Sequence, residues 1–143
     1  PLGVGYSTTY TTDITGTATQ GARIVVTGNP VLPKGERTFD RFFRTDVFRM
    51  PARGTWGNAA KTVIRGPGVN NWDVAAFKNF PIHESISAQF RWEMYNAFNH
   101  TQFSGVNATA RFDAAGNQVN ASFGQFSSAR NPRIMQFALR FYF

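Results

Sequence analysis

The sequence predicts an all-β protein made of strands and loops of a transmembrane antiparallel β-barrel. Three observations support this fold class. Residues 135–143 alternate between large apolar side chains and polar or small ones, residues 86–95 repeat the pattern, and aromatic residues gather near the ends of both runs. A period of two indicates a strand, because a helix repeats every 3.6 residues. Membrane barrels combine such strands with aromatic girdles at both interfaces.

Length and composition are consistent with part of a longer protein. The chain has 143 residues, begins at Pro1 and shows no signal peptide. We therefore expect a fragment. No apolar run of about 18 residues occurs, which excludes a transmembrane helix but not a membrane strand of about 9–11 residues. Cysteine is absent, so no disulfide framework or thiol nucleophile is predicted.

Residues 1–70 are predicted to be mostly loop with short strands. Glycine and proline interrupt the segment repeatedly, and residues 23–27 are predicted to form one short strand. Residues 34–65 carry +5 of the net charge of +7. Such a basic segment attracts anions, although a solvated loop facing acidic neighbours is the alternative interpretation. Its aromatic residues lack a regular period and no RNA-module signature is present, so we expect no nucleic-acid partner.

Three membrane strands are predicted, at residues 71–80, 86–98 and 133–143. The polar turn at 81–85 is short enough to make the first two strands antiparallel neighbours. Lipid is predicted to contact the apolar side chains Trp72, Val74, Ile86, Ala88, Phe90, Trp92 and Met94. The barrel lumen is predicted to contain Arg91, Glu93 and Arg140, which lie mid-strand on the polar face. A soluble β-sandwich, with a protein core on the apolar side, is the alternative.

The last two predicted strands are separated by a long loop at residues 99–132. Within it, residues 110–121 are predicted to form a small hairpin whose turn lies at 113–117.

The chain resembles bacterial outer-membrane proteins at two levels. Its ending looks like the C-terminal signal that outer-membrane β-barrels present to the barrel-assembly machinery, with apolar residues at Met135, Phe137, Leu139, Phe141 and Phe143. A more specific resemblance is to the end of TonB-dependent receptors, and within these to the Oar-like receptors abundant in acidobacteria. It rests on residues 71–73, 77–80, 89–100, 123–125 and 128–133, with further matches at 40–43, 57–58 and 65–68.

This resemblance implies a barrel of 22 strands, of which the chain holds the last few. It implies a bacterial outer-membrane location with a periplasmic C-terminus, residues 99–132 and most of 1–70 outside the cell, and the turn at 81–85 in the periplasm. The implied partners are outer-membrane lipid, the barrel-assembly machinery, an unknown bulky ligand, and the TonB complex through a plug region upstream. The basic loop would make first contact with the ligand, through Arg37, Arg41, Arg44 and Trp56.

No catalytic or metal-binding constellation competes with this interpretation. His83 and His100 are the only histidines, the eight carboxylates show no paired spacing, and hydrolase and zinc-protease motifs are absent. We therefore expect no enzymatic activity, no cofactor and no metal. Two alternatives to an energy-coupled receptor stay open: a passive porin-like barrel, and a soluble or surface-displayed β-rich binding module.

Overall fold

The computed structural model describes residues 1–9, 14–16 and 21–143. Residues 10–13 and 17–20 of the predicted N-terminal loop lie outside the described residues. The described part of the chain contains nine β-strands and one short 3-10 helix, Lys34–Glu36, and no helix long and apolar enough to span a membrane. The all-β prediction is confirmed. The chain divides into two compact units: a loop unit (Pro1–Pro67 and Ser104–Ser128) and a strand unit (Gly68–Phe103 and Ala129–Phe143).

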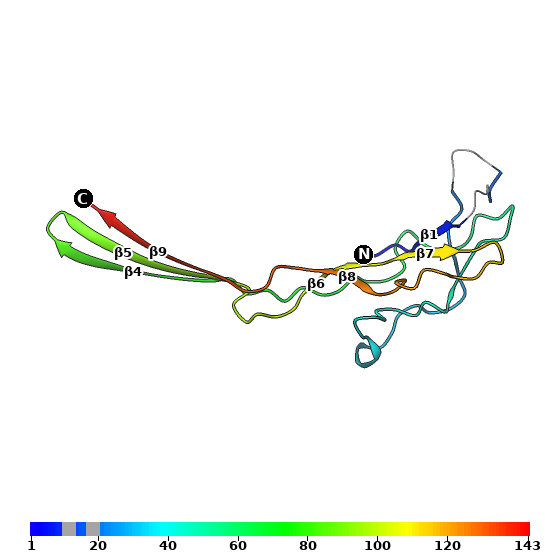
Figure 1. Ribbon diagram of the computed structural model, residues 1–143, viewed down its shortest axis with the longest axis horizontal. Helices are drawn as coiled ribbons and strands as arrows, with labels where there is room; N and C mark the ends of the chain where they lie inside the picture. Colours follow the sequence, from blue (N-terminus) through cyan, green and yellow to red (C-terminus); the bar gives the residue numbers. More distant parts are fainter. Residues whose placement is uncertain (10–13, 17–20) are drawn as a thin grey trace. The chain divides into compact units, whose positions relative to one another are not determined.

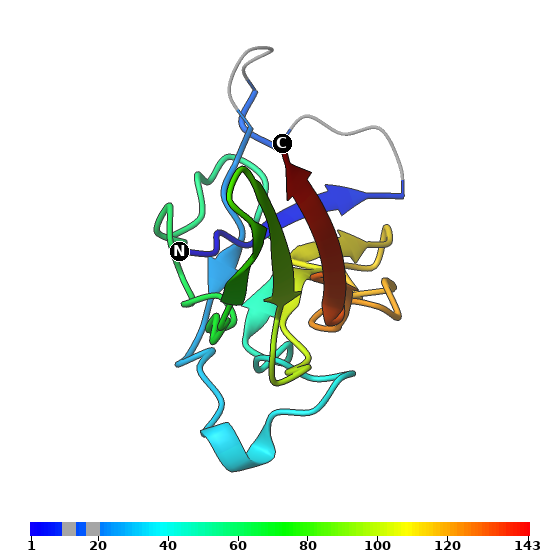
Figure 2. The ribbon, with the colours of Figure 1, turned by 90° about the vertical axis from the view of Figure 1, so that its left-hand side faces the viewer.

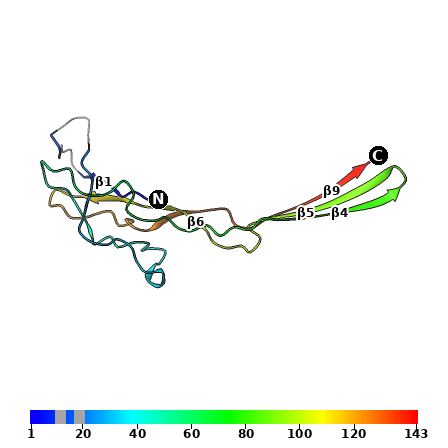
Figure 3. The same cartoon turned by 180° about the vertical axis from the view of Figure 1, so that it is seen from behind.

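The strand unit is one antiparallel sheet of three long strands. These are β4 (Val74–His83), β5 (Ile86–Tyr95) and β9 (Ile134–Tyr142). Strand β5 lies in the middle and pairs with both neighbours (Figure 2). The pairing of Ser87 with Tyr142 brings the C-terminal end of β9 beside the β4–β5 turn (Figures 1 and 3). The last strand of the chain, β9, is therefore an edge strand of this sheet.

The strand bounds differ from those predicted. Strand β4 starts at Val74, three residues later than predicted, and runs through Pro81 to His83. The predicted turn at 81–85 therefore shrinks to two residues, and His83 pairs with Ile86 instead of lying in the turn. Proline lacks a backbone donor and is tolerated only at sheet edges and bulges. Pro81 meets both conditions, because β4 is an edge strand of this sheet and the register shifts between Pro81 and His83.

The loop unit is held together by pairings between segments far apart in sequence. Strand β1 (Gly5–Thr8) runs parallel to β7 (Thr109–Phe112), and β2 (Val25–Val26) runs antiparallel to β3 (Phe48–Arg49). Strands β6 (Phe103–Val106) and β8 (Phe126–Ala129) form another two-stranded sheet. Strand β2 confirms the short strand predicted at 23–27.

The hairpin turn predicted at 113–117 is present. The backbone amide of Asp113 donates to the carbonyl of Asn117 over 3.0 Å, and Phe112 forms a bridge with Gln118. The chain after β7 therefore reverses direction at the predicted turn.

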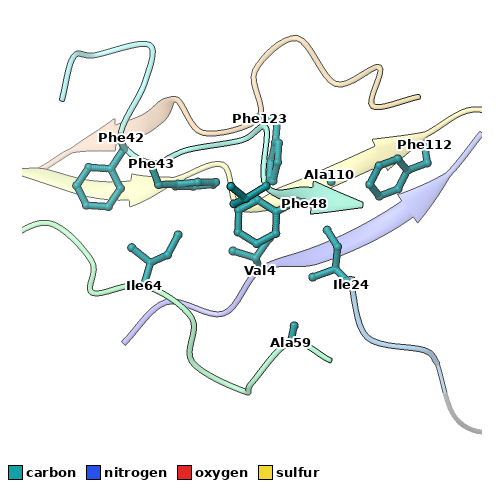
Figure 4. Packing of buried hydrophobic residues seen from close by; sticks show 11 residues of the cluster. Val4, Ile24, Phe42, Phe43, Phe48, Ala59, Ile64, Ala110, Phe112 and Phe123 are labelled. Atoms are coloured by element: carbon teal, nitrogen blue, oxygen red, sulfur yellow. The ribbon is translucent and has the colours of Figure 1, made fainter. Parts of the chain in front are cut away.

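A hydrophobic core fills the loop unit, which the prediction of mostly loop did not anticipate. Phe43, Phe48 and Phe123 pack as a T-shaped trio with ring centroids 5.3–5.7 Å apart (Figure 4). The core combines residues from both stretches of the unit: Val4, Ile24, Phe42, Val47, Ala59, Ile64, Ala110 and Phe112. Fully burying one such side chain stabilises a fold by about 1.5–3 kcal/mol. Segments 1–67 and 104–128 are therefore one folded body rather than two independent loops.

Candidate functional site

The three long strands place their apolar side chains on one common face. Residues directly paired across an antiparallel sheet point to the same side. The register gives four rows across β4, β5 and β9: Phe80, Ala88, Phe141; Lys78, Phe90, Leu139; Ala76, Trp92, Phe137; and Val74, Met94, Met135. Most residues predicted to contact lipid, and all of the proposed C-terminal signal within β9, thus lie on this apolar face.

The apolar face is open rather than packed against a second layer of its own unit. Phe137 is 62% exposed and the terminal Phe143 is 94% exposed. The ring of Phe137 stacks between Phe90 and Trp92, each 6.2 Å away between centroids, which forms an aromatic ladder across β5 and β9. A contiguous exposed apolar surface marks an interaction with a partner or a membrane.

Trp72 is the exception among the residues predicted to contact lipid. It precedes β4, its indole N–H donates to Asn70 over 3.0 Å, and its ring meets Phe98 edge-on. Trp72 therefore belongs to the end of the sheet rather than to a strand.

The opposite face of the sheet carries most of its polar side chains, together with Phe77 on β4 and Ile134 on β9. Arg91 forms an ion pair with Glu93 on the same strand, and the amide of Gln89 donates to Asn79 on β4 over 2.9 Å. Arg140 pairs in register with Gln89 and so lies on the same face. The three residues predicted to face a lumen are thus brought to one side of the sheet. That this side lines a lumen stays a prediction.

A hydrogen-bonded cluster of asparagines and one aspartate lies at the end of the sheet away from the β4–β5 turn. Asn96 is buried and has φ of 52°, a left-handed conformation that terminates β5. The Asp73 carboxylate accepts from the backbone amide of Asn96 and from the side chain of Asn71, over 3.0 and 2.9 Å. The Asn96 amide group donates to the carbonyls of His100 and Asn131. The stretches 71–73 and 96–100, which carry the family resemblance, therefore have a structural role here.

The four residues predicted to contact a ligand are not brought together. Arg37 lies 5.2 Å from the centre of the Phe42 ring and donates to the carbonyl of Leu32, so it covers the core. Arg44 forms an ion pair with Asp46 at 2.6 Å. The hydrogen bond between them raises the pKa of Arg44 and lowers that of Asp46. Arg41 is exposed, and no ion pair is found for it among the described residues.

Trp56 lies instead at a pocket that sequence reasoning missed. Gly21, Arg23, Trp56 and Gly57 line an open pocket of about 500 Å³ within the loop unit. The indole is half exposed, and the exposed residue Arg23 adds a guanidinium, one nitrogen of which donates to the carbonyl of Ala59 over 3.4 Å. Such a pair offers an aromatic face and hydrogen-bond donors to a ligand with a flat ring and acceptor oxygens.

The backbone around this pocket is fixed by hydrogen bonds between two segments. The amide of Arg23 donates to the carbonyl of Trp56 over 2.8 Å, and the Asn58 side chain bonds both the N–H and the C=O of Val26. Gly57 has φ of 71°, and a Cβ there would overlap the carbonyl oxygen of Arg23. Only glycine fits this close approach, so the position of Trp56 is determined before any ligand binds.

The sequence of both units matches a known family. A family model for an outer membrane beta barrel domain matches residues 2–136. The chain belongs to this family. No curated protein and no solved structure matches the chain. As an outer membrane beta barrel domain, the chain is located in the outer membrane. That its three long strands cross the membrane stays a prediction.

The family match overturns the alternative of a soluble β-sandwich. That lipid contacts the apolar face stays a prediction. Among the described residues, no group of three or more His, Asp or Glu side chains is placed to hold a metal ion. The expectations of no enzymatic activity and no cofactor stay predictions.

Proposed function

We propose that the chain is the C-terminal part of a TonB-dependent outer-membrane receptor of the Oar-like type, which moves a bulky ligand across the outer membrane. The observation that carries this proposal is a folded loop unit with a fixed pocket, adjoining in sequence the strands of an outer-membrane barrel. A receptor must capture its ligand before transport, and preorganised sites bind at lower entropic cost. A passive porin has no need of such a site.

The proposed ligand surface of the receptor is the pocket lined by Arg23 and Trp56. The +5 charge of residues 34–65 favours an anionic ligand. A surface with excess positive charge attracts anions over distances near the Debye length. Truncating Trp56 to alanine should weaken binding without unfolding the unit, since the ring lies half exposed.

The proposed orientation has the β4–β5 turn and the C-terminus in the periplasm and the loop unit outside the cell. The chain has no cysteine, so single cysteines introduced here are unambiguous labels within it. We expect Glu84→Cys to react with a membrane-impermeant maleimide only after the outer membrane is permeabilised. Asn117→Cys, at the exposed hairpin turn, should react in intact cells. The reverse pattern would contradict the orientation.

The apolar end of β9 is proposed to engage the barrel-assembly machinery. Deleting Phe143 should reduce the fraction of protein recovered as folded barrel in the outer membrane. Replacing Tyr142 by serine, on the other face of the strand, is the matched control. Unchanged assembly without Phe143 would count against the signal.

A passive porin-like barrel is the second candidate, and the coding sequence upstream separates the two. A plug domain with a TonB box before the barrel supports the receptor, since these parts couple it to the energy source through the TonB complex. A barrel without a plug supports the porin.

A further inference from the structure

One charged side chain interrupts the apolar face of the sheet. Lys78 pairs with Phe90, and Phe90 pairs with Leu139, so the lysine lies in a row with two large apolar residues. It is the only charged residue in the four rows of this face. Because side chains alternate between the two faces along a strand, Lys78 lies on the same face as Val74 and Ala76.

The charge of Lys78 is not compensated within the sheet. The four rows contain no carboxylate, and the ion pairs of the described residues, Arg44–Asp46 and Arg91–Glu93, do not involve it. A lysine on the lipid side of a barrel costs about 2–4 kcal/mol at the bilayer midplane and about 0–1 kcal/mol near the interfaces. The ammonium group is therefore expected to reach an interface or to meet an anion from outside the chain.

The position of Lys78 in the sheet allows its ammonium group to reach the interface. Its row is the second from the β4–β5 turn, four residues along β5 from Ile86 to Phe90. Strands rise about 3.3 Å per residue and tilt about 35–45° in barrels, which places the row roughly 10 Å below the turn. The four-carbon stem of lysine carries its charge further toward the interface while its methylenes stay in apolar surroundings.

We propose that Lys78 binds the phosphate of an anionic phospholipid in the leaflet nearest the β4–β5 turn. The acyl chains of this lipid contact Phe80, Phe90 and Leu139, the exposed apolar neighbours of Lys78 in the same and the adjoining row. The lipid supplies both features that the face demands, a negative charge and hydrocarbon. The inference rests on the proposed contact of the apolar face with lipid.

The test compares lysine with a side chain of similar length and no charge. The full-length protein, with and without Lys78→Met, is reconstituted in vesicles of phosphatidylcholine alone or mixed with phosphatidylglycerol, at low salt. We expect phosphatidylglycerol to raise the folded-to-unfolded ratio of the unsubstituted protein about fivefold more than that of Lys78→Met, which corresponds to ~1 kcal/mol per basic residue near a membrane surface. Lys78→Arg should keep the dependence on anionic lipid, as should Arg140→Met on the opposite face.

The same lipid dependence in Lys78→Met as in the unsubstituted protein would overturn the proposal. A separate measurement tests its premise. A fluorophore attached at Leu139→Cys, in an otherwise cysteine-free protein, should be quenched by brominated lipids. Quenching without an effect of Lys78 rejects the phospholipid site alone, whereas absence of quenching rejects the lipid contact of the whole face.

Discussion

The loop unit and the strand unit use phenylalanine in opposite ways. In the loop unit, Phe43 is completely buried and meets Phe48 and Phe123 edge-on. In the strand unit, Phe137 stacks on its neighbours but leaves 62% of its surface open. Apolar surface is favourable wherever it leaves water, whether a protein core or a bilayer receives it. The same residue type therefore stabilises one unit from inside and forms an open apolar face on the other.

The two units also differ in how their pattern appears in the sequence. In the strand unit, apolar residues recur at every second position of β5 and β9, because alternate side chains of a strand lie on the same face. The core of the loop unit is assembled from single residues of irregular segments, brought together by contacts such as the hydrogen bond from the Phe42 amide to the Gly124 carbonyl, 2.9 Å long. Its apolar residues consequently show no period.

The largest expected effect comes from removing a core ring. Phe43→Ala should destabilise the loop unit by about 3–5 kcal/mol, because it leaves a cavity among buried aromatic side chains. Hydrogen exchange followed by mass spectrometry should show loop-unit amides exchanging roughly a hundredfold faster or more, since each 1.4 kcal/mol is about tenfold. Phe137→Ala is the matched control and should leave these amides unchanged. Equal effects of both variants would contradict the distinction between the units.

A charge on either face of β9 tests the asymmetry of the strand unit. Phe137→Arg should cost about 2–4 kcal/mol if the residue lies near the bilayer midplane, because the apolar face then carries a buried charge in hydrocarbon. Ala138→Arg, one residue along and on the polar face, should cost much less. The folded fraction after reconstitution, measured by the heat-sensitive shift of barrels on gels, compares the two. A larger loss for Ala138→Arg would mean that the polar face contacts lipid.

Removing the contact that fixes the pocket is expected to lower stability by a smaller amount. Asn58→Ala removes two hydrogen bonds to Val26, 2.6 and 2.9 Å long, and should cost about 1–3 kcal/mol at roughly 0.5–1.5 kcal/mol each. Hydrogen exchange of residues 23–26 should rise, while the core around Phe43 stays protected. Asn29→Ala is a control on the same surface, since its side chain bonds only locally, to the amide of Val31. Unchanged protection of residues 23–26 in Asn58→Ala would show that Asn58 does not fix the pocket.

The smallest effect concerns the exposed hairpin turn of the loop unit. The backbone amide of Asn117 donates to the Asp113 carboxylate over 2.8 Å and lowers the pKa of that carboxyl, with help from the Asn117 side chain. A lowered pKa stabilises the turn above the ordinary carboxyl pKa of about 3.9, and this contribution is lost as the pH falls through the folded-state value. An NMR titration should place the midpoint of Asp113 below that ordinary value. An unshifted midpoint would show that the turn is not held by the carboxylate.

The alternation of residues 86–95 and 135–143 was sufficient to predict strands β5 and β9 and the faces of their side chains. A strand's period depends only on backbone geometry, so its faces follow from residue order, and even the position of Lys78 can be read in this way. Strand ends were predicted less well. The start of β4 depends on Asp73 bonding Asn96, 23 residues away, and the length of β4 depends on a bulge beyond Pro81.

The sequence by itself determined the all-β class and the amphipathic strands, because these arise from local periodicity. Periodicity left a soluble β-sandwich open, and the family match excluded it. Tertiary structure alone decided that residues 1–67 and 104–128 form one body. It also separated Trp56 from the arginines predicted to act with it and placed it beside Arg23, 33 residues earlier. The physical reason is that a core built from irregular segments depends on long-range backbone pairing and the fit of individual side chains, neither of which leaves a repeat in the sequence.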